Sequence, residues 1–176
     1  MFNIAAYRPL AAPKPPNVLS DTQLERFLQA FDANTASGIR DSALARCGLD
    51  LGLRRDEAEH RTLDFIDWRG GIVTLQHTRS RRVQRMPRPE LAGGTLEQVL
   101  ARGRPHTCSR SVFVRHRESF GIPLSVDAIR NAMNRTFMRC CLDGQFCNMH
   151  VLRRSTVTRL QRANVSIKKI AELLRH

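Results

Sequence analysis

The apolar positions of the chain follow a helical period near both ends and a period of two in the middle. Between residues 24 and 31, leucine and phenylalanine recur at i, i+3, i+4 and i+7, which predicts one buried helical face. Ser20 and Gln23 stand where a capping box would begin this helix. Residues 34–38 are predicted to form a loop. The further helices predicted cover residues 40–51, 57–61, 90–102 and 126–140, and begin at His150 and at Ile167.

The middle of the chain predicts a small sheet. Residues 63–67, 72–77 and 82–86 are expected to be three short strands, which glycine and arginine-rich turns connect. Pro87 and Pro89 would end the sheet because proline cannot donate to a strand ladder. The predicted fold is mainly α with a three-stranded antiparallel β-sheet (α+β). Residues 1–18, rich in proline, are expected to be a tail or linker remnant, and residues 19–176 a single domain.

The composition points to a polyanionic partner. The chain carries a net charge of +13 with a pI of about 11.2. Only three of its 29 basic residues are lysines, and arginine grips phosphate with a planar fork. A GC-rich genome would also favour arginine, and composition does not separate the two explanations. No apolar run approaches the roughly 18 residues of a membrane span, so a cytoplasmic, nucleoid-associated protein is expected.

The cysteines predict no metal site. Five cysteines, an odd number, fit a reducing compartment. Cys141, Cys147 and His150 are close in sequence, but there is no C-x-x-C pair and no evident fourth ligand for zinc. Buried or incidental thiols are the expected outcome.

Three segments, in order, carry a resemblance to a known family. They are residues 52–57 (GLRRDE), 150–153 (HVLR) and 173–176 (LLRH). They resemble the G-L-R-x-x-E, H-x-L-R and L-L-G-H or L-L-R-H boxes of the tyrosine recombinase (phage integrase) catalytic domain. Each box is weak by itself, but their order, their spacing and the predicted hairpin between the first two make the resemblance specific. It covers residues 18–176.

The resemblance implies DNA cutting and rejoining through a 3′-phosphotyrosine, with no metal or nucleotide cofactor. Arg54 and Arg153 would hold the non-bridging phosphate oxygens, where negative charge builds in the transition state. His150 and His176 would hydrogen-bond the phosphate and manage protons. Glu57 would be a supporting residue that positions the helix after Arg54.

The hairpin departs from the family pattern. The family has a lysine there that protonates the leaving oxygen, and Arg79 occupies the matching position. An arginine holds its proton too tightly to be an efficient general acid, although it can contact phosphate. Arg154 stands where a histidine often follows the second arginine. The residues expected to contact DNA around these positions are Arg81, Arg82, Arg85, Arg88 and Arg154.

The nucleophile is the second departure. In the family it lies within a dozen or so residues after the last box, whereas the only tyrosine here is Tyr7. The expectation is a C-terminally incomplete catalytic domain from a bacterial or phage-type mobile element, which binds double-stranded DNA but is inactive alone. No DNA-clamping domain is recognisable before Ser20, so the affinity should depend strongly on salt.

Other interpretations of the sequence stay open. The chain could be a non-catalytic DNA-binding module that forms a homo-oligomer or joins and disturbs a full-length recombinase protomer on DNA. It could also be the product of a decaying gene, or an arginine-rich domain that binds any polyanion.

Overall fold

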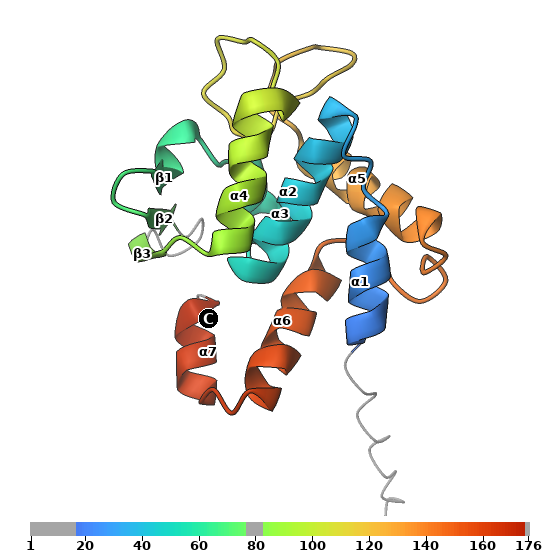
Figure 1. Cartoon of the computed structure of the whole chain (residues 1–176), viewed down its shortest axis with the longest axis vertical. Helices are drawn as coiled ribbons and strands as arrows, with labels where there is room; N and C mark the ends of the chain where they lie inside the picture. Colours follow the sequence, from blue (N-terminus) through green and yellow to red (C-terminus); the bar gives the residue numbers. More distant parts are fainter. Residues whose placement is uncertain (1–16, 77–82, 175–176) are drawn as a thin grey trace, which may run out of the picture.

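The computed structural model describes residues 17–76 and 83–174, in which seven α-helices form most of the fold and a small sheet lies at one side, beside α4 (Figure 1). The sheet is antiparallel with the order β1-β2-β3, and Val73 pairs with both Ile66 and Met86. This confirms the predicted fold class. The α-helices are α1 (Asp21–Gln29), α2 (Ala36–Asp50), α3 (Arg55–Glu59), α4 (Glu90–Gln98), α5 (Val126–Arg139), α6 (His150–Arg162) and α7 (Ile167–Leu173). The strands are β1 (Ile66–Asp67), β2 (Ile72–Gln76) and β3 (Val83–Pro87).

Helix α2 is the central helix of the fold. It packs against α4, α5 and α6, and Leu44 and Cys47 are completely buried on it. The close approach to α6 needs a small residue, because a Cβ atom on Gly48 would lie 3.0 Å from the Met149 side chain. The C-terminal end of α2 leads directly into residues 52–57, so the position of this helix determines the position of the first sequence box.

Aromatic packing joins α1 to α5. The rings of Phe27 and Phe137 have centroids 4.5 Å apart, and both side chains are completely buried. The predicted capping box is also present, since the Ser20 hydroxyl accepts from the Gln23 amide and the Gln23 side chain accepts from the Ser20 amide. The first predicted helix is therefore confirmed together with its buried face.

Three predicted boundaries are wrong. The third helix, α3, covers Arg55–Glu59 rather than residues 57–61, so Arg61 lies beyond it. The other two errors have local reasons. Helix α2 begins at Ala36 rather than near Arg40, because the Thr35 hydroxyl accepts from the Gly38 amide and caps the helix inside the expected loop. The first predicted strand is mostly a 3₁₀ turn, η1 (Leu63–Phe65), and only Ile66–Asp67 pair with β2. Phe65 and Ile66 are buried in succession there, which the alternation of a strand does not allow.

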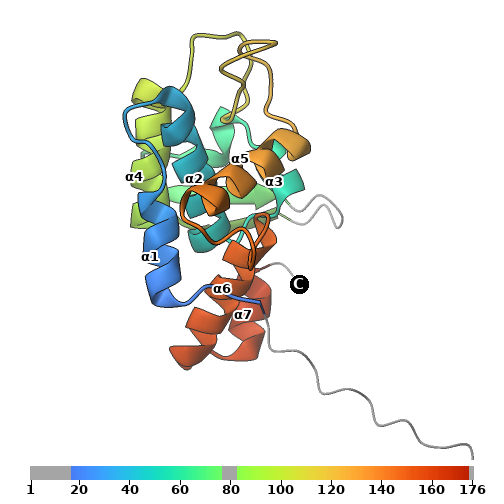
Figure 2. The same ribbon diagram turned by 90° about the vertical axis from the view of Figure 1, so that its right-hand side faces the viewer.

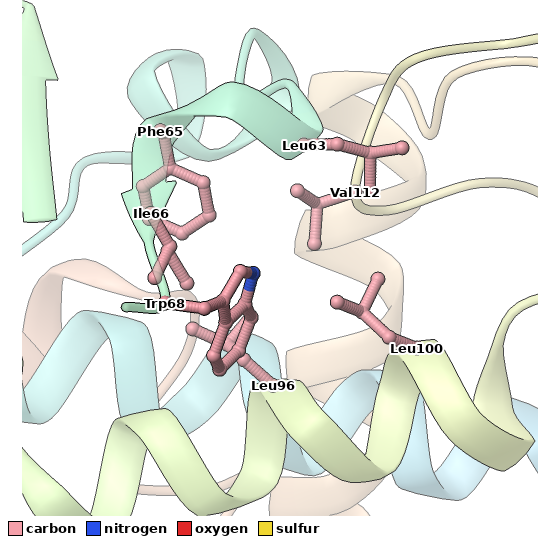
Figure 3. Close-up of a pocket in the computed structure, with 7 residues that line it drawn as sticks. All are labelled: Leu63, Phe65, Ile66, Trp68, Leu96, Leu100 and Val112. Atoms are coloured by element: carbon pink, nitrogen blue, oxygen red, sulfur yellow. The ribbon is translucent and has the colours of Figure 1, made fainter. Parts of the chain in front are cut away.

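A pocket lies between the start of the sheet and α4, which continues as a π-helical segment η2 (Val99–Gly103) (Figure 3). Its lining is apolar apart from the indole nitrogen of Trp68, so it does not attract anions. The lining residues are Leu63, Phe65, Ile66, Trp68, Leu96, Leu100 and Val112. Across the described part of the chain, every helix falls short of what crossing a lipid bilayer requires.

A buried polar cluster fastens the first turns of α2 to the segment before α5. Arg40 donates two hydrogen bonds to Asp41, one to the Val114 carbonyl and one to Nδ1 of His116. Nε2 of His116 lies 2.6 Å from the Gly103 carbonyl oxygen, so the neutral imidazole with its proton on Nε2 fits both contacts. Burial, and secondarily the charge of Arg40, lower the pKa of His116, while the Gly103 carbonyl and Asp41 act in the opposite direction.

This lowered pKa predicts a loss of stability in acid. The unfolded chain takes up a proton at His116 near its ordinary pKa of 6.5, before the folded chain does, so stability is retained above that pH and falls below it. We expect the melting temperature of wild-type protein to fall more steeply between pH 7 and 5 than that of His116→Gln. Glutamine can accept from Arg40 and donate to Gly103 without titrating. Parallel melting curves for both proteins would contradict this assignment.

Candidate functional site

The first sequence box forms a turn between α2 and α3 that fixes Arg54. The Arg54 amide donates to Oε2 of Glu57 at 2.9 Å, and its Nη1 donates to Oε1 at 3.2 Å. Glu57 is buried, whereas the Arg54 side chain is 24% exposed. One carboxylate therefore orients both the backbone and the guanidinium of Arg54 while leaving part of that guanidinium accessible from outside.

The second box brings Arg153 to the same place. Arg153 lies in the first turn of α6 and is buried. Its Nη1 donates to the carbonyl of Gly52, and its Nη2 donates to the carbonyl of Leu174, the residue that ends α7. A single guanidinium thus joins the end of α2, the start of α6 and the end of α7.

Gly52 has a steric reason to be glycine. Its φ of +57° is left-handed, the conformation that commonly follows a helix C-cap. A Cβ atom there would lie 2.3 Å from Cδ2 of Leu174 and 3.5 Å from Nη1 of Arg153. The glycine of the first box is therefore required by the last helix as well as by the local turn.

His150 lies within the electrostatic field of both boxes. It is the first residue of α6, is exposed, and donates its amide hydrogen to Oδ1 of Asn148 at 2.9 Å. Partial burial lowers the pKa of His150, and nearby positive charge lowers it further. The charges that act on it are those of Arg55, Arg154, Arg153 and Arg54, in decreasing order. A neutral imidazole surrounded by arginines results, beside the positive end of the α6 dipole.

The remaining predicted residues fall into three groups. Arg154 and Arg85 are described and exposed, on α6 and β3. Arg88 has partners within the fold: its Nη1 donates to Oε1 of Glu97 at 2.7 Å, and its Cζ lies 5.3 Å from the centroid of the Trp68 ring. The positions that lie outside the described residues are Tyr7, Arg79, Arg81, Arg82 and His176.

Sequence reasoning missed Arg61. This arginine is buried, and its Nε donates to the backbone carbonyl of Glu57 at 2.7 Å. It thereby supports the residue that orients Arg54. The sequence held one signal for it, the four-residue spacing from Glu57 that brings successive helical turns together.

The site suits an anion with several oxygen atoms. Arg54 and Arg153 supply permanent charge on planar forks, and His150 supplies an imidazole that is neutral near pH 7. A helix N-terminus adds partial positive charge at the same place. Within residues 17–76 and 83–174, no group of three or more His, Cys, Asp or Glu side chains could hold a metal ion.

The chain belongs to the phage integrase family, whose family model matches residues 17–176. A protein of Sinorhizobium fredii named as the integrase/recombinase y4rA is 27% identical over 161 residues. The match covers 92% of this chain and 39% of that relative. The chain therefore spans well under half of this relative's length.

Solved structures share the fold. The XerA recombinase superposes with a TM-score of 0.76 at 21% identity, covering 92% of this chain and 56% of that protein. The Tn1549 transposon integrase in complex with circular intermediate DNA gives a TM-score of 0.71 at 18% identity, covering 95% of this chain and 60% of the integrase. These matches confirm that the fold is that of the tyrosine recombinase catalytic domain.

Proposed function

We propose that this chain binds double-stranded DNA and holds one phosphodiester between Arg54, Arg153 and His150, as the catalytic-domain part of a site-specific tyrosine recombinase. The observation that supports this most is the convergence of two boxes about a hundred residues apart. Arg153 donates to the carbonyl of Gly52, and the Arg54 and Arg153 charges both act on the His150 imidazole. The Tn1549 integrase, which has the same fold, is itself seen bound to DNA.

The proposed chemistry follows from the residue types. Two arginine forks would neutralise charge on the non-bridging oxygens as it builds in the transition state. His150, neutral at pH 7, would donate its ring N–H to a phosphate oxygen. Bound phosphate would raise the pKa of His150, because it offsets the arginine charge that lowers that pKa.

The other family positions are assigned by resemblance. We propose that His176 completes the phosphate site, and that Arg79, Arg81, Arg82 and Arg85 contact DNA from the hairpin. Action on bacterial DNA, as we propose, would bring the protein to the nucleoid. Tyr7 is the only tyrosine among the 176 residues, so we expect these residues by themselves to bind DNA without forming a phosphotyrosine. A covalent adduct on a nicked suicide duplex would contradict that expectation.

Substitution of Arg54 tests the phosphate site. Arg54→Ala should weaken binding to a 30-base-pair duplex and reduce the slope of log affinity against log salt by about 1, the loss of one phosphate contact. Fluorescence anisotropy at several salt concentrations measures both quantities. The matched control is Arg162→Ala, an exposed arginine at the other end of α6.

The control distinguishes a specific phosphate-binding site from general electrostatic attraction between the protein and DNA. An unchanged slope for Arg54→Ala, or equal losses for Arg54→Ala and Arg162→Ala, would favour non-specific polyanion binding by an arginine-rich surface. Melting curves of both variants are needed beside the binding data, because Arg54 also bonds the buried Glu57.

A further inference from the structure

A second surface lies near the N-terminal end of α2, whereas the site described above lies beyond its C-terminal end. Two segments between η2 and α5, residues 104–111 and 115–122, project from the end of the molecule opposite to α6 and α7 (Figures 1 and 2). We refer to these two segments as the distal loops. Neither contains a residue of the site described above.

The distal loops are tied to each other and to the body of the fold. The Thr107 hydroxyl donates to the Gly121 carbonyl at 2.9 Å, which joins the two loops. The Leu63 amide donates to the Arg110 carbonyl at 2.8 Å, which joins the first loop to the body of the fold. A Cβ atom on Gly121 would lie 2.8 Å from the Thr107 hydroxyl oxygen, so the two loops pack closely. Direct contacts therefore hold the two loops against each other.

Two large apolar side chains of the distal loops are exposed to solvent. Phe120 is 62% exposed and Ile122 is 44% exposed. Glu118 and Ser119, just before Phe120, both have positive φ angles, 28° and 57°, which are unfavourable for residues with a side chain. Local backbone strain and an exposed phenylalanine therefore occur together on this surface, and the charge around them decides which partner would fit.

The charge around Phe120 is positive. Residues 102–125 contain five arginines and a single acid, Glu118. Arg110 is paired with Asp64 outside this segment, which leaves four arginines beside Glu118. Arg102, His106 and Arg117 are exposed. The guanidiniums of Arg104 and Arg115 bond a carbonyl oxygen and a hydroxyl, so their charge is not neutralised by a carboxylate. A second copy of a chain with a net charge of +13 would be repelled from this surface, whereas a polyanion would be attracted.

Helix α2 connects the two surfaces, so its length gives the scale of their separation. Arg40, near its start, contacts His116 beside Arg117, and Gly52, just beyond its end, accepts from Arg153. Twelve residues at the helical rise separate Arg40 from Gly52, about 18 Å. That length corresponds to roughly five base pairs of B-form DNA, or half a helical turn.

We propose that the distal loops form a second DNA contact, with Arg117 on the sugar-phosphate backbone and Phe120 against the minor groove, about half a turn from the phosphate at Arg54 and Arg153. An arginine beside an exposed apolar side chain is the combination with which proteins enter and deform a minor groove. The inference rests on the proposed DNA binding and extends it to a surface that the sequence boxes do not include.

The test uses the whole chain and a 30-base-pair duplex of mixed sequence. Phe120→Ala should weaken binding about tenfold, and Arg117→Ala should lower the salt slope by about 1. Both side chains are exposed, so the melting temperatures should stay within about two degrees of wild type. The matched control is Arg69→Ala, an exposed arginine in the turn between β1 and β2, which should bind as wild type does.

Combining the variants separates the two proposals. Because the surfaces are well apart, the affinity losses of Arg54→Ala and Phe120→Ala should multiply in the double variant. Wild-type affinity and salt slope in both Phe120→Ala and Arg117→Ala, with Arg54→Ala impaired, would overturn this inference alone. No DNA binding by the wild-type chain would overturn the proposed function as well. Unchanged DNA binding with loss of poly-glutamate binding in Arg117→Ala would reject DNA in favour of an acidic protein partner.

Discussion

Arg153→Ala is expected to lower the free energy of unfolding by about 2–4 kcal/mol and to weaken DNA binding by at least about tenfold. The first effect arises because the guanidinium is the donor to two backbone carbonyls, those of Gly52 and Leu174, in a buried place. The second arises because the same guanidinium is proposed to bind phosphate. Urea denaturation and anisotropy on the same preparations measure the two losses.

The neighbouring residue provides the control. Arg154 follows Arg153 on α6 but is exposed, so Arg154→Ala should change stability by less than about 0.5 kcal/mol. Arg153→Lys keeps the charge and loses the planar fork, so it should recover part of the DNA affinity and little of the stability. Wild-type stability for Arg153→Ala would show that the two carbonyl contacts do not hold α7.

Gly52→Ala is the second large prediction. Alanine would sit in a left-handed conformation and place its Cβ 2.3 Å from Cδ2 of Leu174, so the buried Leu174 side chain at the end of α7 must shift. We expect a loss of roughly 2–3 kcal/mol, of which about 1 kcal/mol comes from the backbone conformation and the remainder from displaced packing. Hydrogen exchange should accelerate in α7 before it does so in α2.

Two other glycines separate these contributions. Gly71 has a similar φ of +63° but open space around it, so Gly71→Ala should show the conformational loss alone. Gly144 has neither a positive φ nor a near neighbour, so Gly144→Ala should be close to neutral. If Gly52→Ala and Gly71→Ala lose the same stability, the contact with Leu174 is not a determinant of the fold.

Local sequence signals were sufficient for the helices because each signal acts over a few residues. The stripe that includes Ile129, Met133 and Phe137 is buried on α5, and Ser125 caps that helix. The same locality explains the errors. Thr35 caps α2 from within a segment whose composition is otherwise typical of a loop. The helix can begin there because Gly38 donates to the Thr35 hydroxyl and packs closely against residues 32 and 35.

The site was only partly predictable. The residues of the boxes can be named from the sequence, but their convergence depends on contacts between positions about a hundred residues apart, such as Arg153 and Gly52. Because arginines are so numerous, the sequence alone does not distinguish the arginines that stabilise the fold from those that are exposed. Arg61 and Arg40 are buried, and Arg88 packs over Trp68, although all three belong to the same basic composition as the exposed ones.

The bonds of Arg153 have a thermodynamic consequence. One side chain both anchors the end of α7 and is proposed to meet the phosphate, so the two events share a coupling free energy that has the same size in both directions. If docking of α7 changes the affinity for DNA by some factor, then bound DNA changes the equilibrium constant for docking of α7 by the same factor. The mobility of α7 should therefore change when DNA occupies the site.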